Sequence, residues 1–212
     1  FADGKTTAEL LKDPSHGLVP TNPNYVPPKN KFDNEPLLDF AIEDVRLQTT
    51  AALKTLKSKL PIKVEPIIGG KSVSTPTIFK RPNPSLKSEI VADVSMATTE
   101  MAETAMQKAH EAFASWKKVT ANTRAEILEK AADIMVRDRF QLMATQILEV
   151  GKPWAEADGD VCEAIDFLRY YARAQRELAN PLRVGHAPGE ISQYIYKPRG
   201  VVSVISPWNF PL

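Results

Sequence analysis

Apolar residues recur every three or four positions through the middle of the chain, which is the spacing of amphipathic helices. The first apolar stripe consists of Met101, Ala105, Ala109, Ala112, Phe113 and Trp116. Thr98 precedes this stripe as a candidate N-cap. Thr123 and Glu126 have the spacing of a capping box and predict the start of a second long helix, which Gly151 ends. Pro153 suits the first turn of a third helix, so the pattern predicts three long helices in series.

Short runs of β-branched residues before and after these helices predict strands. Residues 65–74 are typical of a hairpin, because their central pair Gly69-Gly70 can adopt positive φ. The other strand candidates are residues 78–79, 90–94 and 191–196. Residues 201–205 contain four apolar residues without polar alternation, which is typical of a parallel strand covered on both faces. A buried strand is therefore predicted near the end of the chain.

Proline divides the rest of the chain, since six of its 17 prolines lie within residues 1–36. Residues 1–36 are therefore predicted to be a Pro-rich arm or interdomain linker. Residues 37–63 have loosely helical spacing and predict a helical segment of one or two helices, with Pro61 as the stop. Residues 64–212 hold the remaining predicted elements.

The charge balance and the single cysteine exclude several classes of function. The chain carries 27 Lys and Arg against 26 Asp and Glu, so no net field attracts nucleic acid, and no nucleic-acid partner is expected. One cysteine rules out an internal disulfide framework. The sequence has no apolar run of roughly 20 residues and begins without the features of a signal peptide. A cytoplasmic location is predicted.

The last residues of the chain form a stiffened bend that can hold an amide in place. Pro207 and Pro211 fix their own φ angles and favour extended geometry in the residues before them. Ser206-Pro-Trp-Asn-Phe-Pro-Leu212 resembles the first signature of the NAD(P)-dependent aldehyde dehydrogenase superfamily. Upstream, Glu149-Val-Gly-Lys-Pro153 and Lys197-Pro-Arg-Gly-Val-Val202 also resemble motifs of this superfamily, in the same order.

Two further segments resemble a narrower group, the L-glutamate γ-semialdehyde (Δ1-pyrroline-5-carboxylate) dehydrogenases. They are Phe32-Asp-Asn-Glu-Pro-Leu-Leu-Asp-Phe40 and Asp158-Gly-Asp-Val-Cys-Glu-Ala-Ile-Asp-Phe-Leu-Arg-Tyr-Tyr-Ala-Arg173. The resemblance implies an α/β fold class. The chain would form the N-terminal part of an aldehyde-dehydrogenase-like fold, with an extended arm, small strands, three long helices and the start of the Rossmann-like sheet.

The resemblance also implies roles for residues of the bend. Asn209 would donate its side-chain amide to the oxyanion that develops during aldehyde oxidation, whereas an isolated Asn would bond its own turn backbone. The cofactor NAD would lie in a groove lined by Ile205, Ser206, Pro207 and Trp208. The alternative for these residues is a packed strand end, and both can hold at once, since the wall of a pocket is itself packed. Phe210 would contact the aliphatic stem of the substrate; the alternative is an ordinary core Phe.

Glu163 is the residue that discriminates best between substrates, because an α-ammonium group requires a nearby carboxylate. In the resembling enzymes a glutamate at this place faces that ammonium. The alternative is a surface Glu paired with Arg169 or Lys152. Helical spacing places Glu163, Phe167 and Tyr170 on one face, opposite Val161 and Ile165.

Cys162 lies within the same helical pattern, near Asp160 and Glu163, and is predicted to be a buried, inert thiol. The three histidines are His16, His110 and His186. They lack metal-ligand spacing, so no metal site is predicted. The chain also has no G-x-G-x-x-G loop.

The resemblance implies that the intact parent oxidises L-glutamate γ-semialdehyde to L-glutamate with NAD and assembles as a homo-oligomer through this domain. The family's catalytic cysteine and general-base glutamate lie beyond the signature, so this chain is expected to be inactive alone.

The Pro-rich leader resembles the connector of bifunctional proline utilization proteins, in which a FAD-dependent proline dehydrogenase comes first. Because the leader is long and Phe1 is not an initiator, a bifunctional parent is favoured over a monofunctional one. FAD would then bind outside this segment, and the parent would be cytoplasmic or peripheral to the membrane. Two alternatives remain: a noncatalytic interdomain or interaction segment, and an aldehyde dehydrogenase of different substrate specificity.

Overall fold

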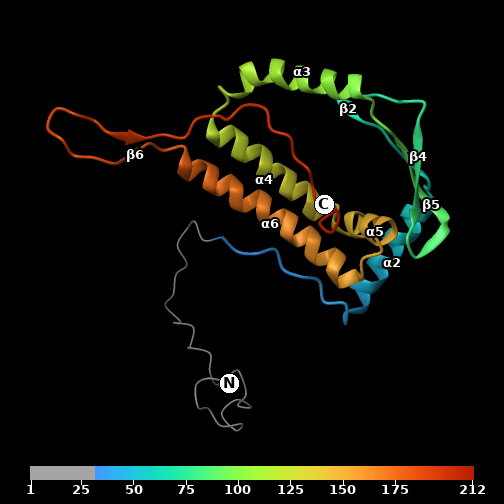
Figure 1. The fold of residues 1–212 in the computed structure, drawn as a ribbon. Coiled ribbons are helices and arrows are strands. Elements are labelled where there is room, and N and C mark those ends of the chain that lie inside the picture. The colour runs from blue at the N-terminus through green and yellow to red at the C-terminus, as the bar shows by residue number, and fades with distance from the viewer. Residues whose placement is uncertain (1–31) are drawn as a thin grey trace, which may run out of the picture. The chain divides into compact units, whose positions relative to one another are not determined.

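The computed structural model describes residues 32–212, and Asn34–Leu212 form a unit separate from the residues before them. The predicted arm at residues 1–36 lies almost entirely outside the described residues. The elements of the unit Asn34–Leu212, labelled in Figure 1 where there is room, are α2 (Glu43–Lys57), β1 (Ile62–Val64), β2 (Ile67–Ile68), β3 (Lys71–Ser72), β4 (Ile78–Asn83), β5 (Leu86–Ser95), α3 (Thr99–Trp116), α4 (Ala121–Arg137), α5 (Arg139–Glu149), α6 (Trp154–Leu178), β6 (Leu182–Arg183) and β7 (Gln193–Tyr194).

β5 is the central strand of a three-stranded sheet. β1 pairs with it in parallel, with Ile62 opposite Ala92, and β4 pairs with it antiparallel, with Ile78 opposite Ser95. The sequence pattern predicts β4 and β5, although shorter than they are, and misses β1. The predicted hairpin is confirmed as β2–β3, in which Gly69 and Gly70 have φ of 58° and 79°.

The helix starts follow from threonine caps. The Thr98 hydroxyl accepts a hydrogen bond from the Met101 backbone N–H, as predicted. The predicted start of the second helix at Thr123 is wrong, because Thr120 is the N-cap and its hydroxyl accepts from the Thr123 N–H at 3.1 Å. Thr123 thus occupies the position at which a capping box would have glutamate.

The three predicted long helices are present as α3, α4 and α6, but the predicted end of the second at Gly151 is wrong, because a shorter helix, α5, fills the last part of that range. α4 ends at Arg137 and α5 begins at Arg139, with Asp138 between them at φ −98° and ψ 14°. The change of direction lets α5 pack against both α2 and α6. Neither Gly nor Pro marks this break, and the apolar spacing therefore predicts one continuous helix.

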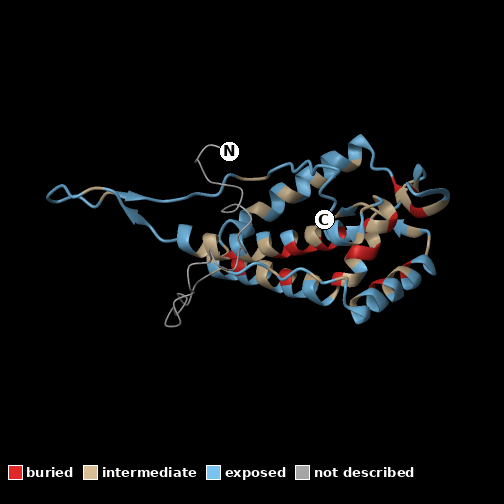
Figure 2. Ribbon diagram, turned by 90° about the horizontal axis from the view of Figure 1, so that it is seen from below, coloured by how far each residue is buried: buried red, intermediate tan, exposed pale blue. Residues whose placement is uncertain are grey.

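The core consists of two clusters that share α5. The first joins α4, α5 and α6 through Ala132, Met143, Ala157, Val161 and Ile165. The second joins α2, β5 and α5 through Leu56, Val91, Ala144 and Leu148. α4 and α6 pack along each other, and Figure 2 shows many of the buried residues on these helices. α6 is thereby held rigidly, with one face left for a site.

The segment after Asp33 is fastened to α6 by hydrogen bonds from its backbone. The Glu35 N–H donates to Asp166 at 2.7 Å, and the Leu38 N–H donates to Asp158 at 2.8 Å. Arg139 donates to Asp158 at 2.6 Å and to the Pro36 carbonyl at 3.0 Å. The acidic residues of α6 therefore accept hydrogen bonds from backbone N–H groups of a segment that has no secondary structure of its own.

The predicted buried strand at residues 201–205 is wrong for this structure. These residues form no strand, and Ile205 is 92% exposed. A parallel strand covered on both faces needs neighbouring strands, and among the described residues no strand pairs with residues 201–205. The predicted α/β fold class is confirmed, and the sheet of the described residues is partial and not closed. In the described part of the chain, no helix has both the length and the apolar character needed to cross a membrane.

Candidate functional site

A cavity of about 590 Å³ lies between the first half of α6, the loop before it and the C-terminal bend. Its lining residues are Val150, Gly151, Lys152, Pro153, Glu156, Gly159, Asp160, Glu163, Trp208, Asn209 and Phe210. Four of the predicted site residues, Glu163, Trp208, Asn209 and Phe210, thus line one cavity. Ile205, Ser206 and Pro207 do not line it, although they are exposed just before it in the chain.

One wall of the cavity is a face of α6. Glu156, Asp160 and Glu163 are spaced by four and three residues, which places their carboxylates on the same side of the helix. Val161 and Ile165 lie on the other side and are fully buried in the core. The predicted two-sided character of this helix is confirmed, and the core fixes which face meets the cavity.

The opposite wall is the bend. The Phe210 N–H donates to the Pro207 carbonyl at 3.3 Å and closes a turn with Trp208 and Asn209 at its centre. Among the described residues, the Asn209 side chain has no hydrogen-bond partner, so the alternative in which it bonds its own turn does not occur here. Its amide remains able to donate to a ligand.

Lys152 connects the two walls, a role that its sequence context does not predict. Its ammonium forms an ion pair with Asp160 and lies 5.7 Å from the centre of the Phe210 ring. The side chains of Lys152 and Asp160 are only 14% and 10% exposed. The Gly-Lys-Pro sequence places the lysine just before α6, but the identity of its partner depends on the fold.

Glu163 is exposed at the cavity and has no ion-pair or hydrogen-bond partner among the described residues. Both of its predicted surface partners are engaged elsewhere. Arg169 donates to Glu35 at 2.6 Å, and Lys152 pairs with Asp160. The Glu163 carboxylate is therefore available to a cationic ligand group.

Cys162 follows the prediction of a buried thiol and does not line this cavity. Burial raises the pKa of the Cys162 thiol to about 11, even though the nearby Arg139 guanidinium acts in the opposite direction. Arg139 Nη2 lies 2.8 Å from the sulfur. A thiol with this pKa remains protonated at neutral pH and cannot serve as the nucleophile of an aldehyde oxidation.

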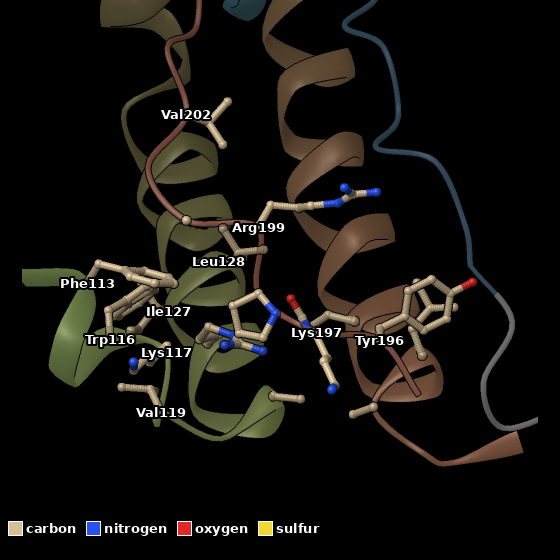
Figure 3. Close-up of a pocket in the computed structure, with 17 residues that line it drawn as sticks. Phe113, Trp116, Lys117, Val119, Ile127, Leu128, Tyr196, Lys197, Arg199 and Val202 are labelled. Atoms are coloured by element: carbon tan, nitrogen blue, oxygen red, sulfur yellow. The ribbon is translucent and has the colours of Figure 1, made fainter. Parts of the chain in front are cut away.

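A second cavity, of about 750 Å³, lies where α3, α4 and the end of α6 meet residues 196–202 (Figure 3). Phe113 and Trp116 of the predicted apolar stripe line it, and α3 has no buried residue among those described. None of the predicted site residues belongs to this cavity. Nor do the described residues contain a group of three or more His, Cys, Asp or Glu suited to a metal ion.

Comparisons with known proteins agree on one family. The aldehyde dehydrogenase family model matches residues 71–212. A 1-pyrroline-5-carboxylate dehydrogenase of Geobacillus sp. (strain WCH70) is 44% identical over 180 residues, which are 85% of this chain and 35% of that protein. A 1-pyrroline-5-carboxylate dehydrogenase of Geobacillus kaustophilus (strain HTA426) is 43% identical and covers the same 85% of this chain and 35% of its own length. The chain thus spans about a third of the length of these curated relatives.

Solved structures give the same result. Proline utilization A (PutA) from Bdellovibrio bacteriovorus has a TM-score of 0.86 and 58% identity, covering 100% of this chain and 22% of that chain. A 1-pyrroline-5-carboxylate dehydrogenase from Thermus with bound NAD has a TM-score of 0.82 and 40% identity, covering 85% and 35% respectively.

Proposed function

Since the chain belongs to the aldehyde dehydrogenase family, we propose that it forms the N-terminal part of an NAD-dependent enzyme that oxidises L-glutamate γ-semialdehyde to L-glutamate. The observation that carries this proposal is the cavity in which Glu163 of α6 lies across from Asn209 and Phe210 of the bend. These residues supply a carboxylate, an amide donor and an aromatic ring, which suit a substrate with an ammonium group, a reacting carbonyl and an aliphatic stem.

Asn209 acts on the reacting carbonyl in this proposal. Attack on an aldehyde converts the carbonyl oxygen into an oxyanion, and a fixed amide N–H stabilises the charge that develops there. The turn between Pro207 and Phe210 holds Asn209, and its side chain has no competing partner among the described residues. The turn thus fixes the backbone of Asn209, and its side-chain amide can donate to the oxyanion.

Glu163 and Phe210 select the substrate. The Glu163 carboxylate binds the α-ammonium group, because it is unpaired among the described residues and lies in a cavity with two further carboxylates. Phe210 packs against the aliphatic stem, since its ring lines the same cavity and is half exposed. A simple aliphatic aldehyde offers no ammonium and gains nothing from Glu163.

NAD accepts the hydride when it is bound. Residues 205–208 fit one wall of a dinucleotide groove, because the backbone N–H groups of Ile205, Ser206 and Trp208 have no hydrogen-bond partner among the described residues and the Trp208 indole is exposed. Ile205, Ser206 and Pro207 would contact the cofactor through their backbone, and Trp208 through its ring. The Thermus relative, whose structure contains NAD, supports NAD as the cofactor.

The parent enzyme is proposed to be bifunctional. The PutA match extends over the whole chain, whereas the matches to the 1-pyrroline-5-carboxylate dehydrogenases cover 85% of it. In this proposal, residues 1–36 link a FAD-dependent proline dehydrogenase domain to residues 37–63, a helical segment, and to residues 64–212 of the NAD-binding domain. The parent works in the cytoplasm or at the membrane surface and forms homo-oligomers through the aldehyde dehydrogenase domain.

The test uses the full-length enzyme and follows NADH formation with L-glutamate γ-semialdehyde and with propanal. We expect Glu163→Ala to raise KM for the semialdehyde at least about tenfold, as for loss of a charge-assisted contact, and to leave KM for propanal within about twofold. Glu163→Asp is the matched control and should recover part of the loss. Equal effects on the two aldehydes would remove Glu163 from ammonium binding.

A further inference from the structure

Lys152 is the single cation among the residues that line the substrate cavity. It lies two residues before the start of α6, and its side chain is mostly buried. A buried ammonium costs free energy unless it is paired, and Asp160 provides the pairing carboxylate from the next turns of α6. The lysine head is therefore fixed in place rather than free in solvent.

The fixed ammonium faces the bend. It lies 5.7 Å from the centre of the Phe210 ring, within the range of a cation–π interaction. Among the described residues, no hydrogen bond or ion pair involves a side chain of residues 206–212. The contact between Lys152 and Phe210 is thus the specific interaction that connects the bend to the wall of α6.

From this geometry we propose that Lys152, held by Asp160, is a positioning residue that fixes the Phe210 ring across the cavity from Glu163 and thereby sets the affinity for the amino-acid semialdehyde. The inference rests on the proposed function, because it assigns the aliphatic stem of the substrate to Phe210. Lys152 touches neither the reacting carbon nor the cofactor in this assignment. A lysine that only stabilises the loop before α6 would give the same fold but no link to Phe210.

A double-mutant cycle in the full-length enzyme separates these two roles. We expect Lys152→Met to raise KM for the semialdehyde about threefold to tenfold, the range of a partly buried cation–π contact, with a smaller change in kcat. Lys152→Arg keeps the cation and should retain most of the affinity. In the Phe210→Leu background, Lys152→Met should change KM by less than about twofold, because the ring it acts through is gone.

A second measurement does not depend on activity. In the 212-residue chain with ¹³C-labelled phenylalanine rings, the Phe210 resonance, assigned from Phe210→Leu, should shift in Lys152→Met and return toward its original position in Lys152→Arg. An unshifted resonance, or equal effects of Lys152→Met with and without Phe210, would overturn the positioning role. An enzyme that is inactive toward the semialdehyde would instead overturn the proposed function, and the resonance would still decide whether Lys152 holds the ring.

Discussion

The ion pair between Arg139 and Asp158 gives the sharpest test of how α6 is held. Arg139 Nε donates to Asp158 Oδ1 at 2.6 Å, and the two side chains are 9% and 1% exposed. The second oxygen of Asp158 accepts from the Leu38 N–H at 2.8 Å. Asp158→Ala therefore removes the partner of a buried cation and leaves a backbone donor unsatisfied in one step.

The expected loss in the free energy of unfolding is about 3–5 kcal/mol, the range for breaking a buried pair from one side. Glu35 reduces this loss slightly, because its carboxylate lies 3.6 Å from Arg139 Nη1 and remains as a partner of the guanidinium. Asp158→Asn should cost less than Asp158→Ala, because the amide oxygen can still accept from Leu38. The measurement is urea unfolding of the 212-residue chain followed by circular dichroism.

Asp133 is the matched control, because it also pairs with an arginine but is 76% exposed and lies 3.7 Å from Arg169. Asp133→Ala should change the free energy of unfolding by less than about 0.5 kcal/mol. A loss below about 1 kcal/mol for Asp158→Ala, or equal losses at the two positions, would refute the reasoning that burial of Arg139 makes its partner essential.

Further predictions concern the core, the bend and the thiol. Ile165→Ala removes most of a fully buried side chain and should lower the free energy of unfolding, measured in urea, by about 2–5 kcal/mol. The same change at the exposed Ile67 should lower it by less than about 1 kcal/mol. Asn209→Ala in the full-length enzyme should lower kcat about 100-fold or more in steady-state assays, and an unchanged kcat would exclude an oxyanion role. Because the pKa of Cys162 is about 11, iodoacetamide labelling of the folded chain should stay slow at neutral pH and accelerate toward that value; fast labelling at pH 7 would contradict its burial.

Local signals in the sequence predicted much of the fold, because the forces that produce them act within one turn. Thr98 caps α3 through a residue three positions away, and Gly69-Gly70 supplies the positive φ of the hairpin. The side of α6 that faces the core also follows from helical spacing. The sequence does not predict the break at Asp138, because the break depends on the packing of α5 against α2 and α6. Nothing near Asp138 in the sequence indicates that packing.

The sequence by itself determined the chemistry that this chain can offer: an amide on a stiff bend, a glutamate on a helix face and a single thiol unsuited to catalysis. The tertiary structure decided which of these groups meet. Glu163 and Asn209 lie far apart in the chain, and the fold brings them to one cavity, whose α6 wall is held by packing against α4 and α5. The exposure of Ile205 and the pairing of Lys152 with Asp160 were likewise decided by which neighbours lie close in space, since burial and ion pairing are properties of the surroundings and not of the residue.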